Sequence, residues 1–212
     1  MKSIKNYCLY YLPKGGNSVN DVLMIDFSDN VLINKREAKD KIVYMYHDND
    51  VISLAILEFS HLAKIKINGT IFLPNSFLIK IINDYLTQNN IDIVLEEKEE
   101  SGFVVGKILS HKEKNKSYLY QVDIKEEIVN IESSYPIDDN LLVCVAKVDT
   151  YLLPNRKINE YKTKDGIVIR GRICTYDDLQ IEVSNSYLPL IMQEDELEIG
   201  SDFFVTEEKG HD

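Results

Sequence analysis

Residues 102–179 hold several short runs rich in Val, Ile and Tyr, separated by clusters of Gly, Asn, Asp and Pro. The stretch opens at residues 103–108 and closes at residues 169–175, and little between them has the pattern of a helix. Short β-type runs divided by turn-forming residues indicate an all-β unit. Because closure removes the exposed edges of such a unit, we expect these strands to form a small barrel.

The chain has 212 residues, of which 44% are hydrophobic, so it is long enough and apolar enough for two small domains. Residues 96–101 form a strongly polar run directly before the first strand of the barrel. A run of this kind is usually a solvated connector. We therefore predict an α+β N-terminal domain over residues 1–100 and an all-β domain over residues 101–212.

The first domain is expected to contain mainly strands. β-type runs occupy residues 7–12, 22–25, 31–33, 42–46 and 91–95, and residues 51–59 fit either a strand, which we favour, or a helix. Residues 35–41 carry charges of both signs, which favours a solvated turn over a nucleic-acid contact. His47, Asp48 and Asp50 could suggest metal ligands. Adjacent residues of an extended chain point to opposite faces, so a turn is the better interpretation.

One helix is predicted near residues 75–90. Asn75 or Ser76 can cap its start, and Asn89 and Asn90 end it. Six apolar residues recur between these ends at spacings of one, three and four: Phe77, Leu78, Ile81, Ile82, Tyr85 and Leu86. This stripe should cover the N-terminal sheet, and the alternative is a docking surface for a partner.

No combination of residues typical of a catalytic centre occurs in the sequence, which has only four His and no glycine-rich phosphate loop. We predict a protein that is not an enzyme and has no cofactor and no metal site. Cys8, Cys144 and Cys174 are odd in number and widely spaced, which argues against a disulfide framework and a structural zinc site. Cys174 is a candidate nucleophile, but its apolar strand favours an inert buried thiol.

The formal net charge of −11 at pH 7 disfavours contact with phosphates. The charge is unevenly distributed, because residues 102–176 carry 12 Lys and Arg against 10 Asp and Glu, whereas residues 177–212 carry 11 Asp and Glu against one Lys. The basic start of the chain lacks the pattern of a signal peptide. No stretch approaches the roughly 20 apolar residues that cross a bilayer. We expect a cytoplasmic protein with no membrane partner.

Four segments occur in a characteristic order: residues 103–106 (Phe-Val-Val-Gly), residues 143–147 (Val-Cys-Val-Ala-Lys), Pro154, and residues 171–175 (Gly-Arg-Ile-Cys-Thr) followed by Leu179. They resemble the first strand, the fourth strand, the following proline and the Gly-Met-Ile-Cys-Ser signature of a tRNA-binding domain. This domain has the oligonucleotide-binding (OB) fold and occurs in YtpR-like bacterial proteins and in the β chain of phenylalanyl-tRNA synthetase. The similarity to YtpR-like proteins extends over nearly the whole chain. Residues 111–119, however, lack the His-Pro motif of the family's first loop, and residues 132–136 replace its Cys-Gly-Ala-x-Asn.

An OB barrel binds nucleic acid through basic groups that track the backbone and aromatic rings on which bases stack. Residues of these types occur at the first loop and at the closing motif, where the resemblance implies tRNA contacts: Lys112, Lys114, Lys116, Tyr118, Arg170, Gly171 and Arg172. Arg170 and Arg172 would share one face of a regular strand, and Gly171 would let an RNA backbone approach closely. The alternative is an ordinary soluble loop at residues 112–116 and an Arg170 that pairs with a carboxylate of the barrel.

Two functions remain open. The first is non-catalytic binding of tRNA or another structured RNA through its shape, with a second copy of the chain or a synthetase as a candidate partner. The second is a degenerate OB protein that has lost RNA binding and acts as a protein-interaction or assembly subunit. The altered first loop and the acidic C-terminal segment favour the second. A positive patch across Lys112, Lys114, Arg170 and Arg172 would support the first.

Overall fold

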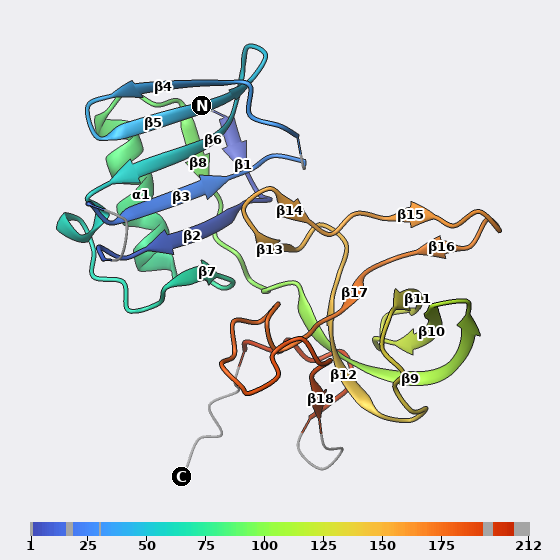
Figure 1. Cartoon of the computed structure of the whole chain (residues 1–212). Coiled ribbons are helices and arrows are strands. Elements are labelled where there is room, and N and C mark those ends of the chain that lie inside the picture. Colours follow the sequence, from blue (N-terminus) through green and yellow to red (C-terminus); the bar gives the residue numbers. More distant parts are fainter. Residues whose placement is uncertain (1, 16–18, 30, 193–196, 206–212) are drawn as a thin grey trace, which may run out of the picture. The chain divides into compact units, whose positions relative to one another are not determined.

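The computed structural model describes residues 2–15, 19–29, 31–192 and 197–205. The chain divides into two compact units, of which the first joins Met1–Glu99 to Tyr151–Lys157 and the second joins Glu100–Thr150 to Ile158–Asp212. The described residues are mostly β-structure with one α-helix (Figure 1). In these ranges, no helix is both long enough and apolar enough to span a membrane.

An antiparallel sheet of six strands forms the framework of the first unit, in the order β4-β5-β6-β3-β2-β7. Its strands are β2 (Cys8–Leu12), β3 (Val22–Asp26), β4 (Lys35–Lys39), β5 (Ile42–His47), β6 (Asp50–Leu57) and β7 (Gly69–Ile71). A 3-10 turn, η1 (Phe59–His61), follows β6, and β1 (Lys2–Ile4) pairs in parallel with β8 (Ile93–Leu95). The strand favoured within residues 51–59 is thus confirmed as β6.

Strand β4 corrects the prediction of a solvated turn over residues 35–41. All five of its residues are exposed, yet its backbone pairs with β5 along its whole length. An edge strand needs pairing on one side only, and its charged side chains discourage pairing with another molecule. The turn itself is confined to Asp40, which has a φ of 53°, and Lys41, and no strand forms at residues 31–33. The predicted turn at residues 47–50 is confirmed, because His47 pairs with Asp50 at the end of the β5–β6 hairpin.

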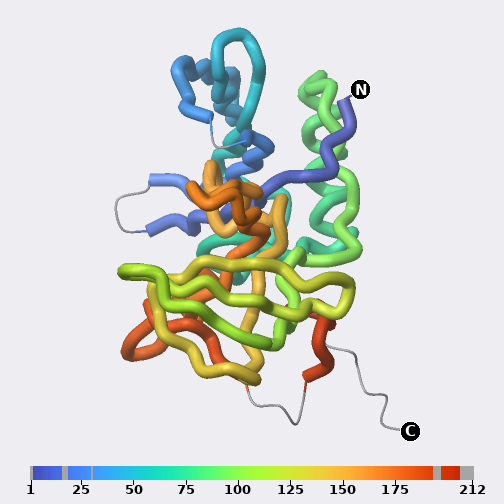
Figure 2. The backbone as a smooth tube through the Cα atoms, turned by 90° about the vertical axis from the view of Figure 1, so that its right-hand side faces the viewer, coloured from blue at the N-terminus to red at the C-terminus, as the bar shows by residue number. Residues whose placement is uncertain are grey.

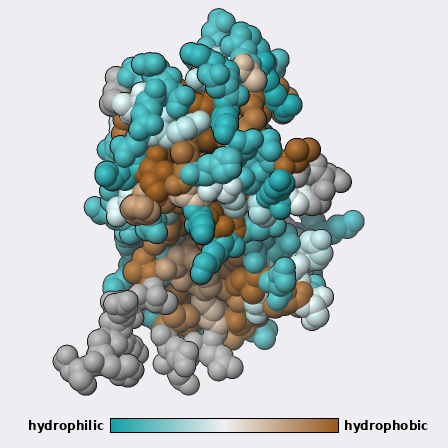
Figure 3. Space-filling view, turned by 90° about the vertical axis from the view of Figure 1, so that its left-hand side faces the viewer, coloured by the Kyte–Doolittle hydropathy of each residue, from teal (hydrophilic) through white to brown (hydrophobic). Residues whose placement is uncertain are grey.

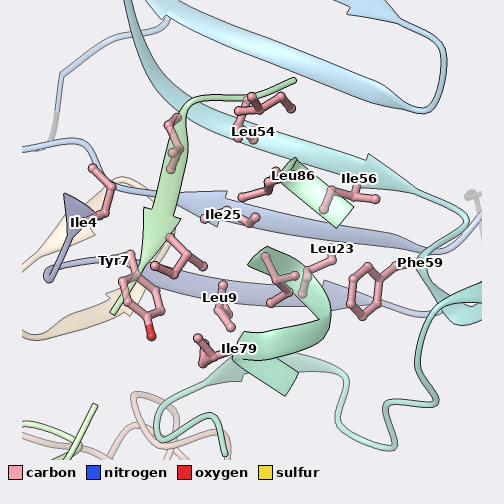
Figure 4. Packing of buried hydrophobic residues seen from close by; sticks show 14 of the residues in the cluster. Ile4, Tyr7, Leu9, Leu23, Ile25, Leu54, Ile56, Phe59, Ile79 and Leu86 are labelled. Carbon is pink, nitrogen blue, oxygen red and sulfur yellow. The ribbon is translucent and has the colours of Figure 1, made fainter. Parts of the chain in front are cut away.

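Helix α1 (Ser76–Gln88) forms where it was predicted, and the Asn75 side chain accepts a hydrogen bond of 2.8 Å from the backbone N–H of Leu78. The predicted apolar stripe is confirmed except at Phe77: Ile82 and Leu86 are fully buried, Leu78, Ile81 and Tyr85 pack against the core, and Ile79 is buried with them. Phe77 is 71% exposed. Figure 4 shows Ile79 and Leu86 of the helix among Leu9, Leu23, Ile25, Leu54 and Ile56 of the sheet. The helix therefore supplies one side of the core of the first unit.

The first unit is discontinuous in sequence. The hairpin of β13 (Tyr151–Leu153) and β14 (Arg156–Lys157) lies in the segment that the sequence assigned to the second domain, yet it belongs to the first unit. The buried Tyr151 hydroxyl donates to the carbonyl oxygen of Ser28 at 2.6 Å, and the Thr70 hydroxyl donates to the Leu152 carbonyl oxygen at 2.8 Å. The Asn155 backbone N–H donates to the buried carboxylate of Asp26. The hairpin is therefore fixed by hydrogen bonds to β3, β7 and the segment after β3.

Replacing Tyr151 with Phe tests the contribution of this hairpin to the first unit. The change leaves the buried Ser28 carbonyl without this donor, so the free energy of unfolding should fall by about 1 kcal/mol. Hydrogen exchange should accelerate in peptides that contain β3. Tyr161→Phe is the matched control, because Tyr161 is 48% exposed and its hydroxyl bonds to an exposed carboxylate of the second unit. Unchanged exchange in β3 would contradict the assignment of the hairpin.

The second unit is built on a curled antiparallel sheet in the order β11-β10-β9-β12-β17, with β18 also paired to β12 (Figure 2). Its strands are β9 (Phe103–Lys114), β10 (Ser117–Asp123), β11 (Ile128–Ser133), β12 (Leu142–Ala146), β17 (Arg172–Ile173) and β18 (Ile191–Met192). A separate hairpin, β15 (Tyr161–Lys162) and β16 (Val168–Ile169), precedes β17. The two ends of the sheet approach each other, because the Arg170 backbone N–H donates to the Asn130 carbonyl oxygen of β11 at 3.0 Å.

Candidate functional site

The predicted first loop is a tight β-hairpin. Strand β9 continues to Lys114, a turn follows at Asn115 with a φ of 57°, and β10 begins at Ser117. Asn tolerates this left-handed conformation, which lets two residues reverse the chain. Lys112 lies opposite Leu119 in the ladder, and Lys114 lies opposite Ser117. Lys112 and Lys114 therefore share one face of the hairpin, and Lys116 lies in its turn.

Tyr118 lies on the other face of the hairpin. It pairs with Glu113, so strand alternation directs its side chain away from Lys112 and Lys114. The ring packs against the core of the second unit and lies 6.2 Å from the ring of Tyr120 and 6.1 Å from that of His111, measured between centroids. The structure thus separates Tyr118 from the lysines with which it was expected to form one contact surface.

Arg170 and Arg172 do not share a strand face. Gly171, with a φ of 105°, lies between β16 and β17 and interrupts the extended backbone. Arg170 is exposed and pairs with two carboxylates, with 2.5 Å from Nη1 to Glu127 and 3.1 Å from Nε to Glu160. The alternative interpretation, that Arg170 pairs with a carboxylate of the barrel, is confirmed.

The other basic candidates differ in their partners. The Arg172 Nε donates at 2.9 Å to the carboxylate of Asp178, whose side chain is only 2% exposed. The Lys114 Nζ lies 2.5 Å from the carboxylate of Asp165, in the turn of the β15–β16 hairpin. No ion pair of Lys112 or Lys116 occurs within the described part of the chain. Three of the five predicted basic residues, Lys114, Arg170 and Arg172, are therefore paired with carboxylates of the same unit.

A hollow of about 240 Å³ joins the hairpin to the closing segment. It is lined by Ser117 of β10, residues 132–135 at the end of β11, and Arg172, Ile173 and Thr175. The Glu132 carboxylate on its wall accepts hydrogen bonds from the hydroxyls of Ser117 at 2.6 Å and Tyr161 at 3.1 Å. The hollow therefore brings together a guanidinium, a carboxylate and several hydroxyls. In the sequence, residues 132–135 stand out only as a departure from a family motif. Because they are far from Arg172 along the chain, the sequence does not indicate that they line the same hollow.

Gly171 has a structural reason to be glycine. Besides its positive φ, a Cβ at this position would lie 2.9 Å from the carbonyl oxygen of Ala146 in β12. The chain just before β17 thus lies close beside the backbone of β12, with which β17 pairs. This contact gives a reason for glycine at this position that needs no ligand.

In the first unit, burial shifts the pKa of the Cys8 thiol and of the Lys98 amine. Burial raises the pKa of the Cys8 thiol to about 12, which leaves it protonated and unreactive at neutral pH. Burial lowers the pKa of Lys98, whose Nζ donates to the Tyr7 carbonyl oxygen at 2.8 Å and lies 4.6 Å from the centre of the Tyr7 ring. In the residues that the structure describes, no group of three or more His, Cys, Asp or Glu could hold a metal ion.

The structure describes only part of the acidic C-terminal segment. Glu194, Asp195 and Glu196, which belong to this acidic segment, lie outside the described residues. Glu198 is described, and its carboxylate lies 2.6 Å from the Lys125 Nζ.

Comparison of the sequence with protein-family models and with curated proteins finds no match in either case. The assignment of the site therefore depends on its geometry and on the resemblance of the short segments.

Replacing Gly171 with Ala tests the closing contact. The left-handed backbone costs about 1–2 kcal/mol for Ala, and the close approach to the Ala146 carbonyl adds to it, so the second unit should lose at least about 2 kcal/mol of stability. Gly166→Ala is the matched control, because Gly166 has a φ of 81° but no neighbouring heavy atom within 4 Å of the added Cβ. Equal losses in the two variants, measured by urea unfolding, would contradict the close approach.

The lowered pKa of Lys98 predicts a pH dependence. A lysine whose folded pKa lies below its unfolded value contributes stability above the unfolded pKa, and that contribution is lost as the pH falls through the folded pKa. The wild-type chain should therefore gain stability relative to Lys98→Met as the pH rises from neutral towards 10. Urea midpoints across this range measure the difference. Lys80→Met, at an exposed position on α1, is the control, and parallel curves for wild type and Lys98→Met would disprove the effect.

Proposed function

We propose that this chain is a non-catalytic binding protein whose second unit is a degenerate OB-type barrel that binds a protein partner rather than RNA. The curled five-stranded path supports the barrel, because it approaches closure between β11 and the segment at Arg170. The segments that resemble the family's first strand, fourth strand and signature coincide with β9, β12 and β17 in that order. In the same proposal the first unit, in which α1 covers a sheet, is of the α+β class.

The local pairing of the basic side chains with carboxylates is the observation that favours a protein partner over RNA. RNA binding gains free energy when Lys and Arg replace the counterions of the phosphates. Arg170 and Lys114 are already paired with Glu127, Glu160 and Asp165, so a phosphate would have to displace these carboxylates and remain beside their charge. The net charge of −11 adds a longer-range repulsion. Both effects oppose RNA.

Exposed apolar residues supply a surface for a protein partner. Tyr187 is 67% exposed, Leu188 is 46% exposed, and Ile191 of β18 is 45% exposed. In the space-filling view of Figure 3, hydrophobic residues lie at the surface among hydrophilic ones. Aromatic and aliphatic side chains of this kind are common in the central part of protein–protein interfaces. A second copy of the chain and a synthetase remain the candidate partners.

RNA binding stays a second candidate because of the hollow at Arg172. Its hydroxyls and its guanidinium could hold one phosphate, and Lys112 and Lys116 lie on the neighbouring hairpin. This would be a short contact with about one to three phosphates, so the logarithm of the affinity would fall against the logarithm of the salt concentration with a slope of about −1 to −3.

The proposed function is tested by removing the carboxylates that pair with Arg170 and Lys114. The triple variant Glu127→Gln, Glu160→Gln and Asp165→Asn removes the partners of Arg170 and Lys114. Wild type should bind tRNA only weakly even at about 50 mM salt, and the variant should bind at least about tenfold more tightly, with a slope steeper by about two phosphates. The measurement is a tRNA titration at several salt concentrations.

A matched triple variant separates local pairing from net charge. Glu113→Gln, Glu126→Gln and Asp177→Asn change the net charge equally, at exposed positions of the same unit. This control should leave tRNA binding as weak as in wild type. Strong, salt-sensitive binding of tRNA by wild type, weakened by Arg172→Ala, would instead favour the RNA candidate.

A further inference from the structure

Two of the three cysteines lie opposite each other in the second unit. Strands β12 and β17 are antiparallel, with Val145 opposite Ile173, so continuation of this register places Cys144 opposite Cys174. The backbone N–H of Cys174 donates to the carbonyl oxygen of Cys144 at 2.8 Å. Residues opposite each other in a hydrogen-bonded antiparallel pair have Cα atoms about 5.5 Å apart. Disulfides span Cα distances of about 4.4 to 6.8 Å, so this position is compatible with one.

Both thiols lie in the core of the second unit. Both side chains are fully buried and both are free. The neighbouring Cys174 thiol, and after it burial, raise the pKa of the Cys144 thiol. Cys174 also donates to the carbonyl oxygen of Arg172 at 3.8 Å. The sequence predicted an inert buried thiol at Cys174, and its burial is confirmed, but the position of Cys144 beside it could not be seen from their spacing.

We propose that Cys144 and Cys174 form a site of reversible oxidation, at which a peroxide converts the two thiols into an intramolecular disulfide. Once local opening exposes it, one thiol loses its proton to solvent and its sulfur attacks a peroxide oxygen; the O–O bond breaks, and the product is a sulfenic acid and a hydroxide that takes up a proton to become one water. The second sulfur then attacks the sulfenic sulfur, the S–O bond breaks, and a second water leaves. Two thiols and one hydrogen peroxide thus give one disulfide and two waters, and a dithiol reductant reverses the change.

Access to the thiols comes from the weakness of β17. This strand has only two residues, and its ladder with β12 contains only the pairs Val145–Ile173 and Ala146–Arg172. So short a ladder separates at a lower free energy than the whole unit unfolds. We therefore expect oxidation to proceed through local opening and to be slow in the native protein.

The disulfide would make one wall of the hollow more rigid. Arg172, Ile173 and Thr175 line it and flank Cys174 in the sequence. A covalent link from Cys174 to Cys144 would prevent the closing segment from separating from β12. The wall of the hollow that this segment forms would therefore be held in place. Because the link closes a loop of the chain, it should also raise the thermal midpoint of the second unit.

The test is oxidation of the full-length native protein with hydrogen peroxide, followed by mass spectrometry. A peptide that joins Cys144 to Cys174 should form, with loss of two hydrogen atoms, and the circular dichroism spectrum should not change. Dithiothreitol should reverse the link, and the oxidised form should melt at a higher temperature. Cys8→Ser should behave as wild type, whereas Cys174→Ala should form no internal link.

Three results would overturn the proposal. The first is oxidation to sulfinic acid without a link. The second is a link that involves Cys8. The third is a Cys144–Cys174 link that forms only in urea, because it would show that the native arrangement does not bring the thiols into reaction.

Discussion

The close approach of Gly171 to the carbonyl of Ala146 positions the start of the closing strand of the second unit. A side chain at this position would meet that oxygen at 2.9 Å, and the φ of 105° interrupts the extended backbone. Arg170, before the glycine, pairs with Glu127 and Glu160, while Arg172, after it, reaches Asp178 and lines the hollow. Further along the same segment, the Cys174 backbone N–H donates to the carbonyl oxygen of Cys144. Arg170, Arg172 and Cys174, which lie within one short stretch of the sequence, therefore contact three different parts of the unit.

The electrostatics of the second unit show why a motif alone does not define a nucleic-acid interface. The segment at residues 102–176 is slightly basic, and its cations fall on the expected loop and closing motif. In the folded unit, however, Asp165 from the β15–β16 hairpin reaches Lys114, and Glu160, just before this hairpin, reaches Arg170. Exposed ion pairs of this kind contribute little to stability, about 0–1 kcal/mol each. They nevertheless place negative charge where a phosphate would bind.

The features that the sequence predicted well depend on local patterns. Helix α1, the strand β6 and the turn after His47 follow from periodicity, capping and turn chemistry over a few residues. The errors have long-range causes. Strand β4 has only Ala38 among four charged residues, so no apolar alternation reveals it, and its ladder with β5 could not be read from the sequence. The return of Tyr151–Lys157 to the first unit depends on hydrogen bonds to Ser28, Asp26 and Thr70, more than 80 residues away in the sequence. The hollow at Arg172 combines residues from three strands for the same reason.

The central claim is that Arg170 and Arg172 of the closing segment remain bound to carboxylates and do not bind RNA phosphates. The most direct measurement is the ¹H–¹⁵N spectrum of the arginine Nε–H groups as tRNA is added at low salt. Both Nε–H groups donate to carboxylates in the structure, Arg170 to Glu160 and Arg172 to Asp178. The account predicts that their signals stay unchanged throughout the titration. Shifts or broadening of both signals in proportion to the added tRNA, abolished by high salt, would contradict it.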